Sequence, residues 1–218
     1  PVVVLMMCGR PVIFNEVRRD APAILCTWWL GSEAGNAICN VLFGDYNPSG
    51  KLPMTFPQHN GQIPLYYQYK STGRPTALGG WCAKYIDIPT EPAYPFGYGL
   101  SYTTFEYSDV KLLPGNGNDT YARVAVTVKN TGKYEGEEVV QLYVRDEAAS
   151  ITRPVKELKG FDKIKLKVGE SKTVTFDVKR EQLGFYNNQM KFVVEKGDFT
   201  FMVGGNSRDL QEIKYTLN

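Results

Sequence analysis

The sequence has little of the chemistry that most catalytic and metal sites need. His59 is its one histidine, so a nucleophilic triad can be built only around that residue, and a multi-histidine zinc or iron site cannot be built at all. Cys8, Cys26, Cys39 and Cys82 show no C-x-x-C spacing, and three of them lie in apolar segments, which favours buried free thiols over disulfides or a metal site. We therefore expect no metal and no cofactor, and any acid–base chemistry falls to carboxylates.

A dominant charge and a long apolar run are missing as well. The 25 Lys and Arg residues stand against 23 Asp and Glu residues, with the signs interspersed, so we expect no nucleic-acid partner. The longest apolar run, 2–8, is far shorter than the roughly 20 residues that cross a bilayer, and we expect no membrane span. Hydrophobic residues make up 43% of the 218 positions, which is typical of globular domains and predicts one large core or two smaller ones.

The first half of the chain has the pattern of an α/β domain. Its apolar runs predict parallel strands, buried on both faces, at 2–7 and 23–29. Between 31 and 44 the spacing predicts a helix that is capped by Ser32 and ended by Gly44, and 52–56 is expected to form a short edge strand. So few strands make less than a typical sheet, and we expect the natural protein to continue upstream.

The second half has the pattern of a β-sandwich. Apolar residues alternate with polar ones over 122–129 and 140–144, as in strands with one buried face, and glycines 169 and 197 are expected to make hairpin turns. Further strands are expected at 158–168, 173–178, 190–194, 199–203 and 213–217. About seven strands suit an immunoglobulin-like or fibronectin-like sandwich, and because every cysteine lies before residue 83, the fibronectin-like variant is favoured.

Several long motifs identify a family resemblance that covers essentially the whole chain. W-W-L-G-S-E-A-G-N-A (28–37), L-F-G-D-Y-N-P-S-G-K-L-P (42–53) and Y-P-F-G-Y-G-L-S-Y-T-T-F (94–105) closely resemble the C-terminal domain of glycoside hydrolase family 3. The segments 128–132, 136–144 and 153–161 resemble the fibronectin type III-like domain of the same family. The fold class implied is α/β plus all-β. Residues 1–104 would be the C-terminal portion of an α/β sandwich, with an incomplete, mostly parallel sheet and a linker loop, and 105–218 the fibronectin type III-like domain.

This resemblance implies a retaining, exo-acting β-glucosidase of the periplasmic bacterial type, which hydrolyses terminal β-D-glucosyl residues with a pair of carboxylates. In the family the nucleophilic Asp lies in an N-terminal barrel, and the usual acid/base Glu lies before the strand matching 2–6. We therefore expect no catalytic residue in this chain and no activity without the barrel. The expected partners are that barrel and a β-glucoside or β-glucan oligosaccharide. A periplasmic or secreted location is implied, and a homodimer is left open.

Carboxylates of the chain itself have simpler explanations than catalysis. Glu33 lies in the first turn of a predicted helix and Asp45 follows its terminal glycine. Glu137 and Glu138 are adjacent on a strand, so they point to opposite faces and cannot flank one bond.

The aromatic, glycine-rich stretch 65–102 is the candidate binding segment, because long irregular segments of compact domains are usually functional loops or linkers. The family's corresponding loop lies near the mouth of the active site, so the resemblance implies that Trp81, Tyr85 and Asp87 contact substrate. Arg74 is a candidate for binding either sugar hydroxyls or an interface carbonyl. For Trp81, packing between domains is an equally good explanation, and most other aromatics of the stretch are expected to fasten it to the neighbouring domain.

A second function from another class stays open at this point. The chain would then be a non-catalytic carbohydrate-binding or structural interaction module, because a fibronectin-like sandwich is a common spacer and a fold does not imply a function. The two hypotheses differ in whether the strand at 2–6 has a native partner strand on its far side.

Overall fold

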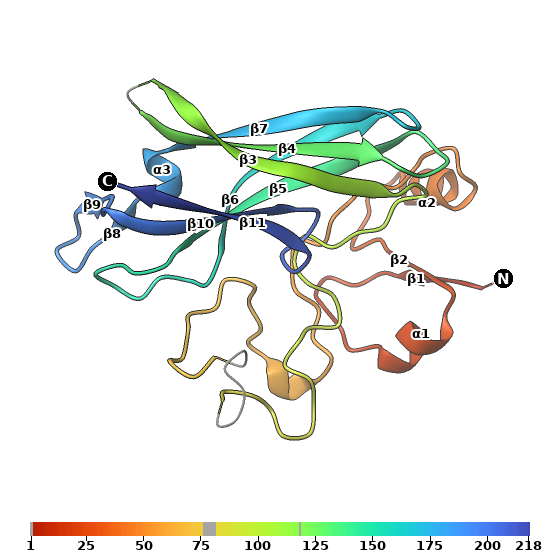
Figure 1. Ribbon diagram of the computed structural model, residues 1–218. Coiled ribbons are helices and arrows are strands. Elements are labelled where there is room, and N and C mark those ends of the chain that lie inside the picture. The colour runs from red at the N-terminus through yellow and green to blue at the C-terminus, as the bar shows by residue number, and fades with distance from the viewer. Residues whose placement is uncertain (1, 76–81, 118) are drawn as a thin grey trace.

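The computed structural model describes residues 2–75, 82–117 and 119–218, which form a small α/β unit, a long loop and a β-sandwich (Figure 1). The first part contains β1 (Val3–Met6), α1 (Asn15–Asp20), β2 (Ala23–Cys26), α2 (Ala34–Leu42) and the 3₁₀ turn η1 (Asn60–Gln62). The second contains β3 (Phe105–Gly117), β4 (Thr120–Asn130), β5 (Gly136–Asp146), β6 (Glu157–Leu166), β7 (Ser171–Lys179), α3 (Arg180–Leu183), β8 (Phe185–Tyr186), β9 (Phe192–Val193), β10 (Gly197–Gly204) and β11 (Leu210–Leu217).

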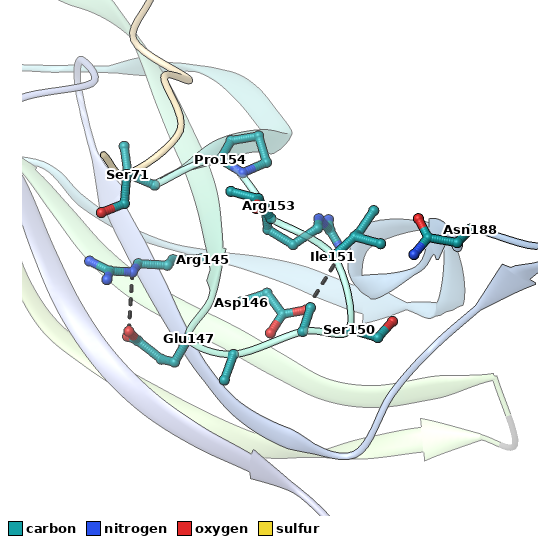
Figure 2. A pocket seen from close by; sticks show the side chains of 13 residues that line it. Ser71, Arg145, Asp146, Glu147, Ser150, Ile151, Arg153, Pro154 and Asn188 are labelled. Carbon is teal, nitrogen blue, oxygen red and sulfur yellow. Dashed lines mark ion pairs between the residues drawn. The ribbon is translucent and has the colours of Figure 1, made fainter. Parts of the chain in front are cut away.

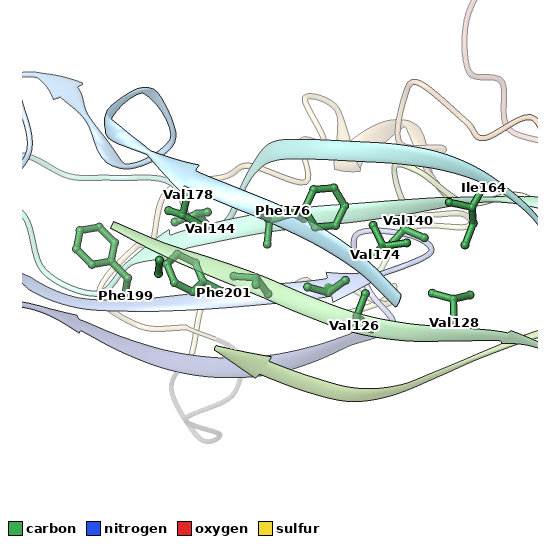
Figure 3. Packing of buried hydrophobic residues seen from close by; sticks show 14 of the residues in the cluster. Val126, Val128, Val140, Val144, Ile164, Val174, Phe176, Val178, Phe199 and Phe201 are labelled. Atoms are coloured by element: carbon green, nitrogen blue, oxygen red, sulfur yellow. The ribbon is translucent and has the colours of Figure 1, made fainter. Parts of the chain in front are cut away.

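The sandwich packs a four-stranded sheet, in the order β11-β10-β5-β6, against a three-stranded sheet, in the order β3-β4-β7. Every pairing within the two sheets is antiparallel. Side chains that alternate along the strands fill the space between the sheets (Figure 3), which confirms the inward pattern predicted for β4 and β5. The fully or almost fully buried members include Val126, Val128, Val140, Leu142, Ile164, Val178, Phe199 and Phe201.

Gly169 and Gly197 have backbone angles that favour glycine, but they do not make the predicted hairpin turns. Gly169 has a φ of 78° and Gly197 a φ of 153°, a region that favours glycine. Gly169 connects β6 to β7, which belong to different sheets, and Gly197 begins β10, whose partners are β5 and β11 rather than the preceding β9. The hairpin prediction is wrong because alternation shows that a strand exists but not which sheet it joins.

In the α/β unit, β1 and β2 pair in parallel from Val3 opposite Ala23 to Met6 opposite Cys26. The prediction that both faces of this pair are buried is wrong for the described residues, since Val3 is 43% and Leu5 39% exposed. The described sheet consists of these two strands, so the expectation of a mostly parallel sheet in the whole domain stays a prediction.

Two further local predictions are wrong, and one is confirmed. Residues 52–56 form no strand. Leu52 and Phe56 make separate backbone hydrogen bonds to residues within 93–98, and Phe56 forms only an isolated bridge to Tyr94. Helix α2 has Glu33 rather than Ser32 at its N-cap, without a side-chain cap; the Glu33 carboxylate instead accepts a 2.6 Å bond from Asn36. Gly44 has a φ of 88° and ends the helix as predicted.

Two glycines let the segment before β3 approach its neighbours closely, one on the sandwich and one in the α/β unit. A Cβ at Gly97 would clash with the side-chain oxygen of Gln141 on β5, and a Cβ at Gly99 would clash with the carbonyl oxygen of Gly50. Gly97 also has a φ of 79°. Only glycine suits the close approach at these two positions.

The remaining sequence expectations concern thiols and membranes. The four cysteines are free thiols, of which Cys39 is exposed and the other three are half-buried, so the expectation of full burial is wrong. None of the helices in the described ranges is both long and apolar enough to cross a membrane.

Candidate functional site

The candidate binding segment leaves and returns to the body of the protein at one point. Phe56 and Tyr94 exchange backbone contacts, with Phe56 N donating to Tyr94 O at 2.9 Å and Ala93 N donating to Phe56 O at 2.8 Å. The Gln62 side chain, 1% exposed, accepts a 2.7 Å bond from Gln58 N and donates a 2.8 Å bond to Pro89 O. These bonds close a loop between residues 58 and 93, which we call the site loop.

His59 belongs to the base of the site loop. Its Nδ1 accepts a 3.0 Å bond from Gly61 N, so the side chain caps η1. The one histidine of the chain therefore has a structural explanation.

Tyr67 fastens the first arm of the site loop to the sandwich, which is the role that the sequence predicted for most aromatics of the stretch, whereas Tyr66 and Tyr69 are 63% and 59% exposed. The Tyr67 ring stacks on Phe96 with centroids 4.3 Å apart and meets Tyr143 of β5 edge-on at 5.7 Å. The Tyr67 hydroxyl accepts a 3.3 Å bond from Leu158 N of β6. Immediately beyond, Tyr69 O accepts a 2.9 Å bond from Val155 N, so this arm runs alongside the β5–β6 connection.

The predicted substrate-contacting side chains lie beyond these anchors. Arg74 O accepts a 2.8 Å bond from Ala83 N, which brings the two arms of the site loop together. The side chains of Arg74, Tyr85 and Asp87 are exposed, and none has a hydrogen-bond or ion-pair partner in the described part of the chain. Both roles left open for Arg74, binding sugar hydroxyls or an interface carbonyl, therefore stay predictions. Trp81 lies outside the described residues.

Sequence reasoning missed the polar contacts that join the segment after α2 to β5. Lys51 Nζ lies 3.0 Å from Glu138 Oε2 and 3.0 Å from Gly99 O. The Tyr107 hydroxyl donates a 2.8 Å bond to the same carboxylate, and burial, followed by the charge of Glu138, raises the pKa of Tyr107 well above its usual range. Turn residues at 47–53 had indicated scaffold, and nothing in the local pattern pointed to a buried carboxylate 87 residues away.

Glu137 makes a second set of contacts to the same segment. Its Oε2 accepts 3.2 Å bonds from the hydroxyls of Tyr46 and Ser49 and lies 2.7 Å from Lys163 Nζ. The bond from Lys163 is the main cause that lowers the pKa of the Glu137 carboxyl. The neighbouring carboxylates 137 and 138 thus bind different groups, and both already have structural partners.

Asp146 is a further carboxylate with a structural partner. Burial raises the pKa of Asp146, as a general acid requires, but its carboxylate lies 3.6 Å from Arg153 Nη1 in a buried ion pair whose side chains are 5% and 8% exposed. Across the described ranges, no three His, Cys, Asp or Glu side chains gather into a group that would hold a metal ion. What the exposed part of the site loop can do is bind: a guanidinium that donates, a carboxylate that accepts and an aromatic ring.

Comparison with known proteins identifies the family. Residues 1–102 match the model of the glycosyl hydrolase family 3 C-terminal domain, and residues 138–207 match that of the fibronectin type III-like domain. The chain belongs to glycosyl hydrolase family 3. Its family 3 relatives include the periplasmic beta-glucosidase of Salmonella typhimurium, 49% identical over 100% of this chain, and a beta-xylosidase of Formosa agariphila, 46% identical over 100%.

Solved family 3 structures share the fold described above. A mutant beta-glucosidase from Listeria innocua, determined in complex with laminaribiose, superposes with a TM-score of 0.92 and 43% identity, over 100% of this chain and 31% of that one. The chain likewise spans 29% of the Salmonella protein and 30% of the Formosa protein. It therefore corresponds to somewhat less than a third of the length of these relatives.

Proposed function

We propose that this chain is the C-terminal part of a retaining, exo-acting β-glucosidase that removes terminal β-D-glucosyl residues. The observation that carries the proposal is the structural likeness to the Listeria innocua beta-glucosidase, which extends over 100% of this chain with a TM-score of 0.92. The carboxylate nucleophile and the acid/base would lie outside these 218 residues, since the chain spans only 31% of the Listeria innocua protein and the family resemblance places both carboxylates upstream. The proposed location is the periplasm or the cell exterior, as for the Salmonella relative.

In this proposal the site loop binds the sugar unit next to the glucosyl unit that is cleaved off. Arg74 donates to ring hydroxyls, Asp87 accepts from them, and Tyr85 and Trp81 provide aromatic surface and polar groups. The exposure of the first three and their lack of partners support this role. A side chain that needed its interactions for folding would be expected to have formed them.

The exposed strand pair supports a larger protein around this chain. Val3 and Leu5 of β1 and Trp29 just after β2 are 43%, 39% and 82% exposed, and an apolar surface of this kind normally lies against other polypeptide. We propose that residues 1–104 complete a mostly parallel α/β sandwich with upstream segments, that an N-terminal barrel packs beside it, and that 105–218 form the second domain. A homodimer is compatible with this arrangement.

Single substitutions in the complete enzyme test the role of the site loop. Arg74→Ala and Asp87→Asn each remove one charged hydrogen-bond partner, about 1.5–3 kcal/mol, so KM for a β-linked glucose disaccharide should rise roughly ten- to hundredfold. Tyr85→Phe and Trp81→Ala should also raise it. An aryl β-glucoside, which has no second sugar, should be affected much less by Arg74→Ala and Asp87→Asn. Lys84→Ala, in the same loop but outside the proposed set, is the matched control, and unchanged KM and kcat in all four variants would refute the assignment.

A further inference from the structure

A pocket that the proposed function does not use lies between the site loop and the sandwich. Its volume is about 570 Å³, within the roughly 300–1,000 Å³ of small-molecule sites. Ser71 of the site loop lies over the β5–β6 connection, and Asn188 of the β8–β9 hairpin lies at the other side (Figure 2). The rest of the lining comes from residues 145–155.

The charges around this pocket are paired within it. Arg145 Nε lies 3.1 Å from the Glu147 carboxylate, and Arg153 Nη1 lies 3.6 Å from the Asp146 carboxylate (Figure 2). Two cations and two anions leave no net charge to attract an ion. The other polar lining consists of the hydroxyls of residues 71, 150 and 152 and the Asn188 amide, so donors and acceptors are interspersed. This composition suits a neutral ligand with several hydroxyl groups.

Arg153 makes one wall of this site rigid. Its side chain is 8% exposed, Nη2 binds Glu157 at 2.6 Å, and the guanidinium lies 4.6 Å from the centroid of the Phe185 ring. Apart from the 3.6 Å ion-pair contact with Asp146, Nη1 has no hydrogen-bond acceptor within the described residues. Because Nη1 is buried, the guanidinium does not face a ligand but keeps this wall of the pocket rigid, and a preorganised wall loses little order when a ligand binds.

The position of the pocket connects it to the site loop. Ser71 precedes Arg74 by three residues, a span of at most about 11 Å of extended chain, and the pocket and the proposed Arg74 contact therefore lie within reach of one oligosaccharide. We propose that the pocket is a distal sugar subsite, which binds a further glucosyl unit of a β-glucan oligosaccharide beyond the unit bound by the site loop. This rests on the proposed function, and it makes the fibronectin type III-like domain part of substrate recognition.

The test is a titration of the ¹⁵N-labelled 218-residue chain with laminaritriose and cellotriose, followed by NMR. We expect saturable shifts of the backbone amides of residues 148–152 and 188 with at least one of the two sugars. Asn188→Trp, which fills the pocket from an exposed hairpin, should raise the dissociation constant at least tenfold. Gln189→Trp, the same change one residue further and outside the pocket lining, should leave it within twofold. Ser150→Trp is a second pocket-filling variant if Asn188→Trp disturbs the fold.

The outcomes separate this subsite from the proposed function. Shifts confined to the site loop, or a dissociation constant that neither pocket-filling variant changes, would overturn the subsite and leave the site-loop assignment intact. Shifts at 148–152 that Asn188→Trp abolishes support the subsite even where Arg74→Ala leaves the kinetics of the complete enzyme unchanged. Maltotriose, with α-linkages, is the ligand control, and equal shifts with it would overturn the specificity for β-glucans.

Discussion

Lys51 and Glu138 form a buried ion pair between the segment that follows α2 and the first half of β5. The Lys51 Nζ lies 3.0 Å from Glu138 Oε2, and the two side chains are 13% and 5% exposed. The partners are 87 residues apart in sequence. Because Gly99 O and the Tyr107 hydroxyl complete the coordination of the two charges, the α/β unit and the sandwich share one polar centre.

Replacing Glu138 by Ala should strongly destabilise the chain. The change leaves the Lys51 ammonium and the Tyr107 hydroxyl buried without their acceptor, and removing one partner of a buried pair costs about 3–5 kcal/mol. Urea unfolding followed by tryptophan fluorescence measures it. Lys165→Ala is the control, because that lysine pairs with Glu135 on the surface, where the side chains are 63% and 45% exposed, and its midpoint should barely move. Equal midpoints for the two variants would contradict the prediction.

The Glu137 contacts should make stability depend on acid pH. The bond from Lys163 lowers the pKa of Glu137 below its ordinary value of 4.5. A carboxyl with a lowered pKa in the folded state contributes stability above that value, and the contribution is lost as pH falls through the folded pKa. Between pH 6 and 3 the thermal midpoint of Glu137→Gln should therefore fall less steeply than that of the unmodified chain. Parallel curves would show that this carboxyl does not titrate differently on unfolding.

The Tyr67 anchor should control the order of the site loop. Tyr67→Ala removes the stack on Phe96 and the contact with Tyr143, so the first arm should separate more often from the β5–β6 connection. Hydrogen exchange at the Val155 amide, which donates to Tyr69 O, should become at least tenfold faster. Tyr69→Ala keeps the backbone acceptor and removes a side chain that is 59% exposed, so its exchange rate is the reference; equal rates in both variants would exclude the anchoring role.

The core of the sandwich should be sensitive to truncation where the surface is not. Phe201 on β10 is fully buried between the sheets, and Phe201→Ala should cost about 3–5 kcal/mol. Phe161 on β6 is 67% exposed, and its replacement by Ala should change the unfolding midpoint far less. Denaturant titrations of both variants measure the difference, and a similar loss in the two would mean that Phe161 is covered in solution.

Much of the sandwich could be predicted from the sequence, because period-2 alternation records directly which side chains face a core. The alternation at 122–129 and 140–144 is now the buried face of β4 and β5. Sheet membership could not be predicted, since the turns at Gly169 and Gly197 look alike whether a chain stays in a sheet or crosses to another. The parallel pair β1 and β2 was expected, but its exposure depends on what packs against it rather than on its own residues.

Less of the candidate binding site could be predicted. Aromatic and glycine content singled out the stretch 65–102, which overlaps the site loop, and anchoring of some of its aromatics to the sandwich was expected from ordinary packing. Glu138 could not be predicted as buried, because a carboxylate in a strand indicates exposure unless its distant partner is known. The roles of Arg74, Tyr85 and Asp87 stay predictions, since exposed side chains without partners show that they are available to a ligand and not that they bind one. The role of Trp81 also stays a prediction, because that residue lies outside the described part of the chain.

The close approaches at Gly97 and Gly99 determine which residues must be grafted together when the sandwich is moved to another protein. Gly99 meets the backbone of Gly50, and Gly97 meets Gln141 of β5 with no room for a Cβ. A chimera that grafts only residues 105–218 onto another hydrolase would set a foreign loop against Gln141 of β5, where the residue in place of Gly97 has no room for a Cβ. A graft that carries residues 46–58 and 93–104 along with the sandwich keeps both contacts between residues of the same protein. It should give a soluble hybrid where the shorter graft does not.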